Sequence, residues 1–519
     1  MSLDTPTAAP RATAREWIGL AVIMLPCIIY SMDLTVLNLA VPHLSADLDP
    51  SAVQTLWIMD IYGFMVAGAL ITMGTLGDRI GRRRLLLVGA ATFGLTSLAA
   101  AFAPSAELLI LARALLGISA ATLAPSTLSL IRNMFLDDRQ RTFAIGIWIA
   151  GFSVGGAIGP LVGGLVLEHF WWGAVFLINV PCMLLLLVLG PFLLPEFRDE
   201  KAGKLDPVSA AQSVVAVLAV IYGLKRIAVE GFDIWVAASL ALGLAVGTIF
   251  VRRELRLDAP LIDMSIFRVP AVLGSLVCNM AGVFALFGAF FFIAQYLQLA
   301  LGMSPLEAGF WVAPSGAIFA VSSLVTPAIA RRFRPSRIIA ASFALTALGF
   351  VVLAFVGSWG AHAVLLGLIL CSLGFSPVAT LTTDLVMASV APEKAGQASG
   401  VSETSFEFGG ATGIALLGSI FVAVYHSRMN LPANVPGEVA ETARRTLDGA
   451  FTAAKTLPAD QDAALFATAS RAFTQAFAIT AGVSAVITFA VAIFAFYALR
   501  GPGDLCGRDR DLAAAQATV

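Results

Sequence analysis

Apolar stretches separated by short polar breaks run along nearly the whole chain. Fourteen of these stretches are long and apolar enough to cross the roughly 30 Å of a bilayer's hydrocarbon as α-helices. The predicted spans cover residues 17–41, 54–76, 85–103, 108–131, 142–166, 173–194, 208–229, 233–251, 271–299, 307–330, 336–357, 361–387, 397–424 and 474–499. The pattern therefore predicts an all-α polytopic membrane protein.

Longer polar breaks at residues 195–207 and 252–270 isolate spans seven and eight between two groups of six. A weak repeat supports this 6 + 2 + 6 plan, because GTLGDRIGRRRL after the second span has a shorter basic counterpart, IARRFRPSRI, at the equivalent place after the tenth. Repeated halves place a substrate cavity between them at mid-membrane. The predicted parts are an N-terminal tail (1–16), a first bundle (17–194), an inserted helix pair (208–251), a second bundle (271–499) and a C-terminal tail (500–519).

Composition and charge fix the expected orientation. The chain is 59% hydrophobic and 13% charged, whereas soluble proteins are about 25% charged. With the N-terminus in the cytoplasm, most of the 32 Lys and Arg residues fall in cytoplasmic segments. The first span is too long for a signal-peptide core and lacks an A-x-A cleavage site. We therefore expect an uncleaved multi-pass protein of the cytoplasmic (inner) membrane with both termini inside.

The external segment between the last two spans, about residues 425–472, is polar but carries helical spacing of apolar residues on both sides of LPAD. It predicts a helical hairpin above the mouth of the cavity. A solvated connector with no role in transport is the alternative.

Three charged residues stand inside predicted spans near one depth. A carboxylate such as Asp33, within LPCIIYSMDLTVLNLAVP, costs about 2.5 to 3.5 kcal/mol near a helix centre. Counted at about 1.5 Å per residue, Asp33, Asp60 and Arg113 all lie roughly 8 to 12 Å below the outer surface. A guanidinium that approaches and leaves a carboxylate changes how tightly the carboxylate holds a proton. We expect the three to meet as a proton-coupling group; a fixed structural ion pair is the alternative.

A second acidic set lies deeper, in VSETSFEFGG of span thirteen. Glu403 and Glu407 are four residues apart and therefore share one helix face. Two like charges so close favour a proton on at least one of them until a cation arrives. The pair predicts a cation-binding site, with a structural role as the alternative. Asp384, near the inner end of span twelve, is a possible further member, although a helix-end or interfacial role would explain it equally well.

Aromatic rings could line the cavity and bind flat cations through cation–π contacts of about 0.5 to 2 kcal/mol each. Lipid-facing aromatic residues are the ordinary alternative. The candidates are Tyr30, Trp57, Tyr62, Trp148, Phe152, Phe287, Phe291 and Trp311.

Glycine-rich motifs mark two further places. Span five contains GFSVGGAIGPLVGG, whose fourfold spacing predicts a smooth ridge for close helix packing, while its proline predicts a bend. In GTLGDRIGRRRL the glycines allow a tight cytoplasmic turn, and its aspartate can cap the next helix or pair with an arginine. The candidate conformational residues are Gly74, Gly77, Asp78, Arg79, Gly81 and Arg82 in the turn, and Gly151, Gly155, Gly159, Pro160, Gly163 and Gly164 in span five.

Sites for other chemistry are not expected. The five cysteines and four histidines show no metal-ligand or disulfide spacing, and Gly203-Lys204 lacks the remainder of a phosphate-binding loop. The net charge of −1 says nothing about partners, and we expect no nucleic-acid partner. We therefore expect a transporter that needs no cofactor or metal, and not an enzyme. Its partners would be small cationic molecules, protons and membrane lipids, and we expect a monomer.

Taken together, the motifs make the chain resemble the fourteen-span drug:proton antiporters of the major facilitator superfamily, of the Qac, Smv and Lfr type. The resemblance rests on MDLTVLNLAVP (32–42), LWIMDIY (56–62), GTLGDRIGRRR (74–84), LARALLG (111–117), GGAIGPLVGG (155–164) and FLINVP (176–181).

The resemblance implies proton-coupled export of lipophilic cations such as quaternary ammonium biocides and dyes, and hence antibiotic and biocide resistance. It assigns proton coupling to Asp33 and Arg113, and the antiporter motif to Gly159 and Pro160. Span ten departs from some dication-exporting relatives, with Pro314-Ser315-Gly316 in place of an acid, which leaves the handling of dications open. Export of an endogenous lipid or antibiotic, with incidental drug resistance, is the alternative function.

Overall fold

The computed structural model describes residues 10–199, 205–429 and 459–499, together with positions 439, 443 and 450. The regular structure of these residues is helical, and fourteen of the helical segments are long and apolar enough to cross a membrane. The predicted all-α fold with fourteen spans is confirmed.

Each predicted span corresponds to one long helix or to two helices in succession. The sixth span is divided between α6 and α7, and the ninth ends in a short π-helical turn, η2. The bounds are α1 (Ala14–Leu48), α2 (Ala52–Ile80), α3 (Arg82–Ala101), α4 (Ala106–Met134), α5 (Asp138–His169), α6 (Ala174–Leu177), α7 (Asn179–Leu193), α8 (Pro207–Glu230), α9 (Ile234–Glu254), η1 (Met264–Arg268), α10 (Pro270–Gln295), η2 (Tyr296–Ala300), α11 (Pro305–Ala330), α12 (Pro335–Ala354), α13 (Val356–Trp359), α14 (Ala361–Ala388), η3 (Pro392–Lys394), α15 (Ala395–Arg428) and α18 (Ala459–Ala498).

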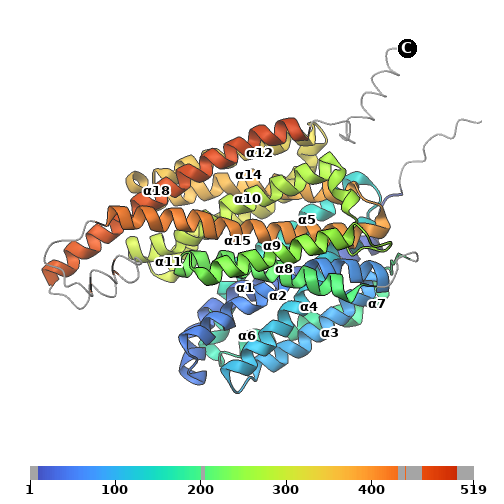
Figure 1. Cartoon of the computed structure of the whole chain (residues 1–519), viewed down its shortest axis with the longest axis horizontal. Coiled ribbons are helices and arrows are strands. Elements are labelled where there is room, and N and C mark those ends of the chain that lie inside the picture. Colours follow the sequence, from blue (N-terminus) through green and yellow to red (C-terminus); the bar gives the residue numbers. More distant parts are fainter. Residues whose placement is uncertain are drawn as a thin grey trace, which may run out of the picture.

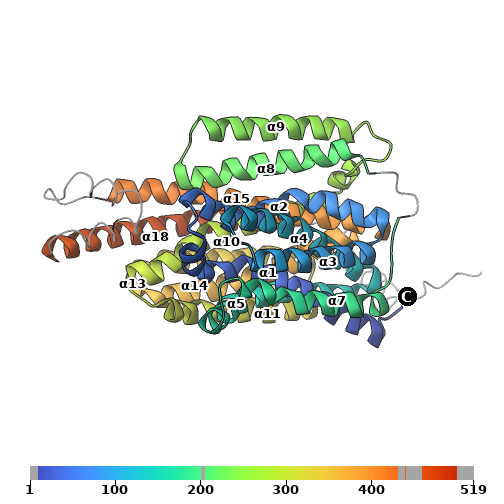
Figure 2. The ribbon, with the colours of Figure 1, turned by 90° about the horizontal axis from the view of Figure 1, so that it is seen from below.

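The helices pack as two groups joined along two contacts. In the first group α1 packs against α5, and α2 and α3 pack against α4; in the second, α12 packs against α14 and α18, and α10 against α15. The groups meet where α2 crosses α15 and where α5 crosses α11. Helix α8 lies against both α2 and α15, with α9 on its outer side (Figure 2). The inserted pair therefore covers one of the two seams between the groups.

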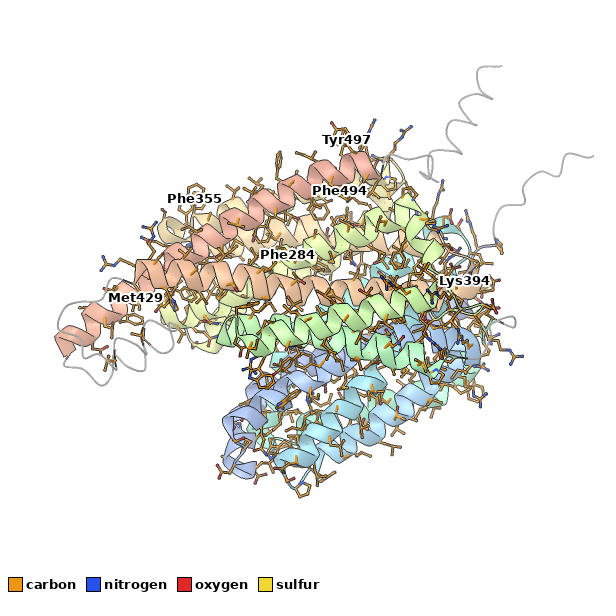
Figure 3. All side chains as sticks on the ribbon, in the orientation of Figure 1. Phe284, Phe355, Lys394, Met429, Phe494 and Tyr497 are labelled. Atoms are coloured by element: carbon orange, nitrogen blue, oxygen red, sulfur yellow. The ribbon has the colours of Figure 1, made fainter. Side chains whose placement is uncertain are left out.

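The two ends of the bundle differ in charge and in how far apart the two helix groups lie. We call the end formed by residues 78–84, 331–337 and 392–397 the Arg-rich end. Figure 3 labels Lys394 at this end and Met429 at the opposite one. The ribbons of the two groups converge toward the Arg-rich end and diverge toward the opposite end (Figure 1). The diverging end is therefore where the groups are less closely joined.

The segment expected to form an external hairpin is described only in part. Residues 460–477 are helical as predicted, but they continue without a break into the last span as α18, a helix of 40 residues. The second arm is therefore continuous with the last span, and the hairpin itself stays a prediction. The first arm and the LPAD turn fall outside the described residues, apart from positions 439, 443 and 450 and the first two residues of α18, Ala459 and Asp460.

The glycine ridge of α5 is the surface on which α1 packs. A Cβ atom added at Gly155 would collide with the backbone carbonyl of Ile28, and one at Gly159 would collide with the Thr35 hydroxyl. Gly151 and Gly163 face α1 in the same way. Helix α5 runs continuously through Gly159 and Pro160, so the predicted bend stays a prediction.

The variant Gly155→Ala is expected to destabilise the first group, because its methyl would meet rigid backbone. Overpacking of this kind costs about 1–3 kcal/mol, which should lower the melting temperature of the purified protein in detergent. Gly482→Ala is the matched control, since a Cβ added there meets nothing within 4 Å. Equal melting temperatures for the two variants would contradict the packing role.

Candidate functional site

An ion pair between α1 and α4 is buried in the first group. Nη1 of Arg113 lies 2.7 Å from Oδ2 of Asp33, and the two side chains are 2% and 1% exposed. Nε of Arg113 also donates to the carbonyl oxygen of Ile58 at 3.0 Å. Removing one partner of such a pair leaves an uncompensated buried charge. The structure thus brings together two of the three residues predicted for proton coupling.

Asn179 completes the surroundings of this ion pair. It stands at the break between α6 and α7, where its Nδ2 donates to Oδ1 of Asp33 at 3.2 Å and to the hydroxyl of Ser97 at 3.1 Å. Both oxygens of Asp33 are therefore hydrogen-bonded. Sequence reasoning missed Asn179, although a polar amide within the apolar run FLINVP was a signal for it.

Asp60 does not join this group. Its Oδ1 accepts a hydrogen bond from Nζ of Lys225, on α8, at 2.6 Å. The expectation that Asp60 meets Asp33 and Arg113 is wrong, because successive residues of a helix point about 100° apart. Arg113 instead reaches the backbone of the residues just before Asp60, at Ile58 and Met59. The depth of Asp60 was predicted from the sequence, but the side of α2 from which it projects was not.

The predicted glutamate pair lies at the interface between the two groups. Glu403 and Glu407 project from α15, and the hydroxyl of Tyr30, on α1 of the other group, donates to Oε1 of Glu407 at 3.4 Å. Both carboxylates are half-buried. Among the described residues neither forms an ion pair with a Lys or Arg. The pair is thus an acidic position without an ion-pair partner among the described residues.

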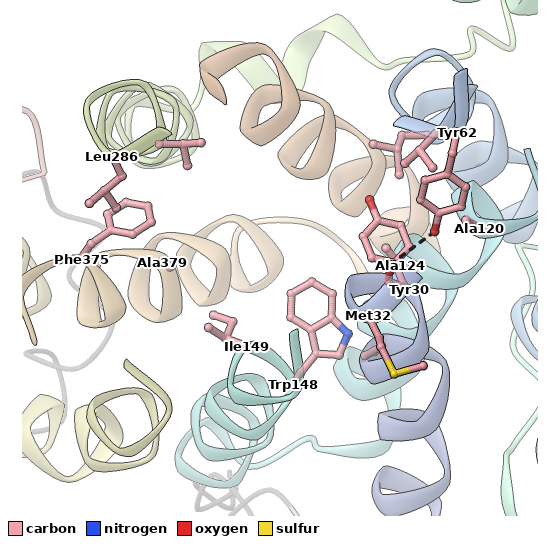
Figure 4. Close-up of a cluster of buried hydrophobic side chains, with 14 of the residues drawn as sticks. Tyr30, Met32, Tyr62, Ala120, Ala124, Trp148, Ile149, Leu286, Phe375 and Ala379 are labelled. Atoms are coloured by element: carbon pink, nitrogen blue, oxygen red, sulfur yellow. Dashed lines mark hydrogen bonds between the residues drawn. The ribbon is translucent and has the colours of Figure 1, made fainter. Parts of the chain in front are cut away.

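Four of the eight predicted aromatic residues form one cluster beside Glu407. The ring of Tyr30 lies 5.4 Å from that of Phe152 and 6.2 Å from that of Tyr62, and Trp148 lies 4.7 Å from Phe152. Figure 4 shows Tyr30, Tyr62 and Trp148 projecting toward one another from three helices. The cluster reaches Glu407 through the hydroxyl of Tyr30, and a carboxylate beside aromatic rings is a suitable environment for an organic cation.

The remaining aromatic candidates are not part of this cluster as described. The side chain of Phe291 lies outside the described residues. The others pack in separate pairs: Trp57 with Phe64, Phe287 with Phe406, and Trp311 with His362.

Asp78 joins the two groups at the Arg-rich end. Its carboxylate pairs with Arg82 at 2.7 Å and accepts the backbone N–H groups of Gly396 and Gln397 at 2.9 and 2.8 Å. These N–H groups belong to the first turn of α15, where the helix dipole favours a negative charge. Arg82 in turn donates to the carbonyl of Pro392 at 2.6 Å. Asp78 thus pairs with an arginine, which was one of its two expected roles. It does not cap the next helix, α3, which has no side-chain cap; it caps α15 of the other group instead.

The glycines of the same motif make this contact close. A Cβ atom at Gly74 would collide with the carbonyl of Gly396. Gly81, between α2 and α3, has a φ of 110°, a backbone conformation that favours glycine. Gly77 of the same motif faces Leu85. In the other glycine motif, on α5, Gly164 is half-buried.

Residues 260–263, which lead from α9 into the second group, pack against the contact between α2 and α15. Arg79 donates to the carbonyl of Pro260 at 3.1 Å, while Thr75 and Gln397 both donate to the carbonyl of Leu261 at 2.8 Å. Asp263 pairs with Lys394 at 2.6 Å. The hydrogen bond from Lys394 lowers the pKa of Asp263 to about 2, so this contact persists at neutral pH.

Asp384 belongs to the same contact region and not to the glutamate pair. Its carboxylate accepts hydrogen bonds from Nε of Arg141 at 2.8 Å and from the hydroxyl of Thr142 at 2.7 Å. These bonds join α14 to α5. Arg132 adds a hydrogen bond to the carbonyl of Met387 at 2.8 Å. The interfacial alternative for Asp384 is therefore the one that its contacts favour.

Comparison with known proteins agrees with this architecture. The model of the Major Facilitator Superfamily matches residues 23–414. The multidrug efflux pump LfrA of Mycolicibacterium smegmatis is 43% identical over 96% of this chain and 98% of its own length. The methyl viologen resistance protein SmvA of Salmonella typhimurium is 35% identical over 88% and 93%. The tetracenomycin C resistance and export protein of Streptomyces glaucescens is 31% identical over 94% and 93%.

A solved structure shares the fold. The human organic anion transporter MFSD10 (TETRAN) superposes with a TM-score of 0.62 over 92% of this chain and 99% of its own, at 15% sequence identity. The resemblance expected from the motifs is confirmed, and the relatives are efflux pumps and resistance proteins of the membrane, not enzymes. The family model covers most of the chain, and with the relatives above it shows that this protein belongs to the Major Facilitator Superfamily.

Proposed function

We propose that the protein exports lipophilic cationic drugs, dyes and quaternary ammonium biocides in exchange for protons, taking them from the cytoplasm or the inner leaflet by alternating access. The observation that carries this proposal is the pair Glu403 and Glu407, which has no basic ion-pair partner among the described residues and lies beside the aromatic cluster at the interface. An organic cation would supply the missing positive charge and stack on the rings of Tyr30 and Phe152. Relatives named as multidrug and methyl viologen resistance proteins support the same substrate class.

Proton coupling is assigned to Asp33, with Arg113 as its counter-ion. A proton on Asp33 would remove the charge that compensates Arg113 in its buried position, so protonation and the arrangement of the two helices are linked. A chain of contacts leads from this pair to the cation site. The guanidinium of Arg113 lies 5.0 Å above the ring of Tyr62, whose hydroxyl donates to the backbone carbonyl of Tyr30 at 3.4 Å. Tyr30 in turn contacts Glu407.

The arrangement corresponds to an outward-facing state if the Arg-rich end is cytoplasmic. The positive-inside rule favours that orientation, with both termini in the cytoplasm of a bacterial inner-membrane protein. The Asp78 and Asp384 contacts would then close the cytoplasmic side, and the diverging end would release substrate. The proposal further takes the protein to act as a monomer surrounded by lipid, with two six-helix bundles and an inserted pair.

The direct test is accumulation of ethidium in cells that lack other efflux pumps, with and without expression of this protein. Expression should lower accumulation, and an uncoupler should restore it, because the proposal draws the energy from protons. Lowered accumulation that persists in the presence of an uncoupler would refute proton coupling while leaving export intact.

Export of an endogenous antibiotic is the second candidate. Its support is the similarity to the tetracenomycin C resistance and export protein, which is 31% identical over nearly the whole chain. Binding measurements on purified protein separate the candidates, since a cation exporter should prefer cations to neutral antibiotics of similar size. A panel with monovalent and divalent members would also settle whether the chain handles dications, such as methyl viologen, without an acid at Pro314–Gly316.

A further inference from the structure

Helix α8 presents one face to the seam between the two groups. A small apolar cluster, separate from the main core, joins α8 to α2 and α15 there; it consists of Phe64, Ala67, Val217, Ile221 and Ala411. Lys225 lies one turn beyond Ile221 and therefore on the same face of α8. Helix α8 thus points the ammonium group of Lys225 toward the seam between the two groups. Most of α9 faces away from them (Figure 2).

Lys225 holds the carboxylate of Asp60. Its Nζ lies 2.6 Å from Oδ1 of Asp60 and 4.5 Å above the ring of Phe64, which is one turn along α2. The side chains of Lys225 and Asp60 are 32% and 42% exposed. An ion pair this accessible contributes little to folding stability. Its main consequence is that Lys225 neutralises Asp60 toward other ions that approach it.

The four carboxylates projecting from α1, α2 and α15 between the membrane faces form two classes. Asp33 and Asp60 each have a built-in cation, whereas Glu403 and Glu407 form no ion pair with a described Lys or Arg. The two classes also differ in depth. At about 1.5 Å per residue, Glu407 lies roughly 18 Å along α15 from the Arg-rich end, and Asp60 roughly 30 Å along α2 from the same end. Asp60 therefore lies between the glutamates and the diverging end.

We propose that Lys225 is a specificity-determining residue that keeps Asp60 occupied on the exit side of the pathway. This inference rests on the proposed function, in which a cation leaves Glu403 and Glu407 toward the diverging end. A free carboxylate at Asp60 would attract the departing cation, or one from the external solution, and slow its release. The tethered ammonium of Lys225 occupies that position, so the cation passes without being recaptured.

The test is equilibrium binding of radiolabelled tetraphenylphosphonium to the purified full-length protein in lipid nanodiscs. Lys225→Gln should bind the cation about two- to fivefold more tightly at low salt, the range expected for one exposed ion pair, and less so at high salt. Lys225→Arg should match the unmodified protein. Arg226→Gln is the matched control, because it removes a neighbouring charge that pairs with Asp233 and not with Asp60.

A double variant identifies the carboxylate concerned. Lys225→Gln combined with Asp60→Asn should return the affinity to that of the unmodified protein. A double variant that stays tight, a Lys225→Gln variant with unchanged affinity, or equal tightening in Arg226→Gln would each overturn the proposal.

Asp60→Asn alone gives an independent measurement that does not depend on Lys225→Gln folding. It leaves Lys225 without its carboxylate and should weaken cation binding by about two- to fivefold; unchanged or tighter binding would count against the proposal. If the unmodified protein does not bind tetraphenylphosphonium, the proposed function is wrong. If it binds the cation but the variants do not behave as stated, only the role of Lys225 is wrong.

Discussion

Replacing Asp33 with Asn is expected to abolish uphill efflux of ethidium. The amide cannot take up a proton, and Arg113, 2% exposed, loses its counter-charge. Breaking a buried ion pair costs about 3–5 kcal/mol, so the variant should also have a lower melting temperature. The measurement is uptake of ethidium into inverted vesicles energised by a pH gradient. Exchange of ethidium for unlabelled ethidium, which needs no proton, should persist because the glutamate site is intact.

The matched control for Asp33→Asn is Asp206→Asn. Asp206 caps the N-terminus of α8 and pairs with Arg253, on α9, at 2.7 Å. The hydrogen bond from Arg253 lowers the pKa of Asp206 below its usual range, so this carboxylate stays charged throughout the working pH range. The control should keep uphill efflux. Uphill efflux by Asp33→Asn at the rate of the control would refute the proton assignment.

Replacing Glu403 and Glu407 together with Gln is expected to remove most of the affinity for organic cations. The loss should be about tenfold or more, since an interaction with a charged group contributes about 1.5–3 kcal/mol. Titration calorimetry of the purified protein with tetraphenylphosphonium measures it. Binding of a neutral lipophilic drug should change much less, because the aromatic cluster around Tyr30 and Phe152 remains.

Two further variants isolate the cause of that loss. Glu168→Gln removes an exposed carboxylate near the end of α5 and should leave the affinity unchanged. Tyr30→Phe keeps the ring but removes the hydroxyl that donates to Glu407, so its effect should be smaller than that of the double glutamate variant. Full cation affinity in the double variant would place the binding site elsewhere.

Part of the candidate site could be predicted because it depends on local spacing or on unmet charge. Glu403 and Glu407 share a face because they are four residues apart on one helix. Asp33 and Arg113 stand at one depth, and each is costly in hydrocarbon unless it is paired. The structure joins Asp33 and Arg113 for that reason.

Other contacts depend on which way each helix faces. Asp60 stands at the same depth as Asp33, yet it meets Lys225 of the inserted pair. Lys225 lies within a predicted span beside Arg226, and two basic residues there were a signal that sequence reasoning passed over. Asp78 caps α15, more than 300 positions later in the chain. No local pattern identifies a partner at that distance in sequence.

Hydrophobic periodicity and composition were sufficient for the number of membrane helices and the all-α fold, because every backbone polar group within a bilayer must be satisfied inside its own helix. They also placed the ionisable side chains along the membrane normal, since helical rise is constant. The pairing of those side chains, and the end at which the two groups close, were decided only by tertiary packing. Both depend on the rotation of each helix about its axis and on glycine-lined crossings such as Gly74 with Gly396, which join residues that the sequence keeps far apart.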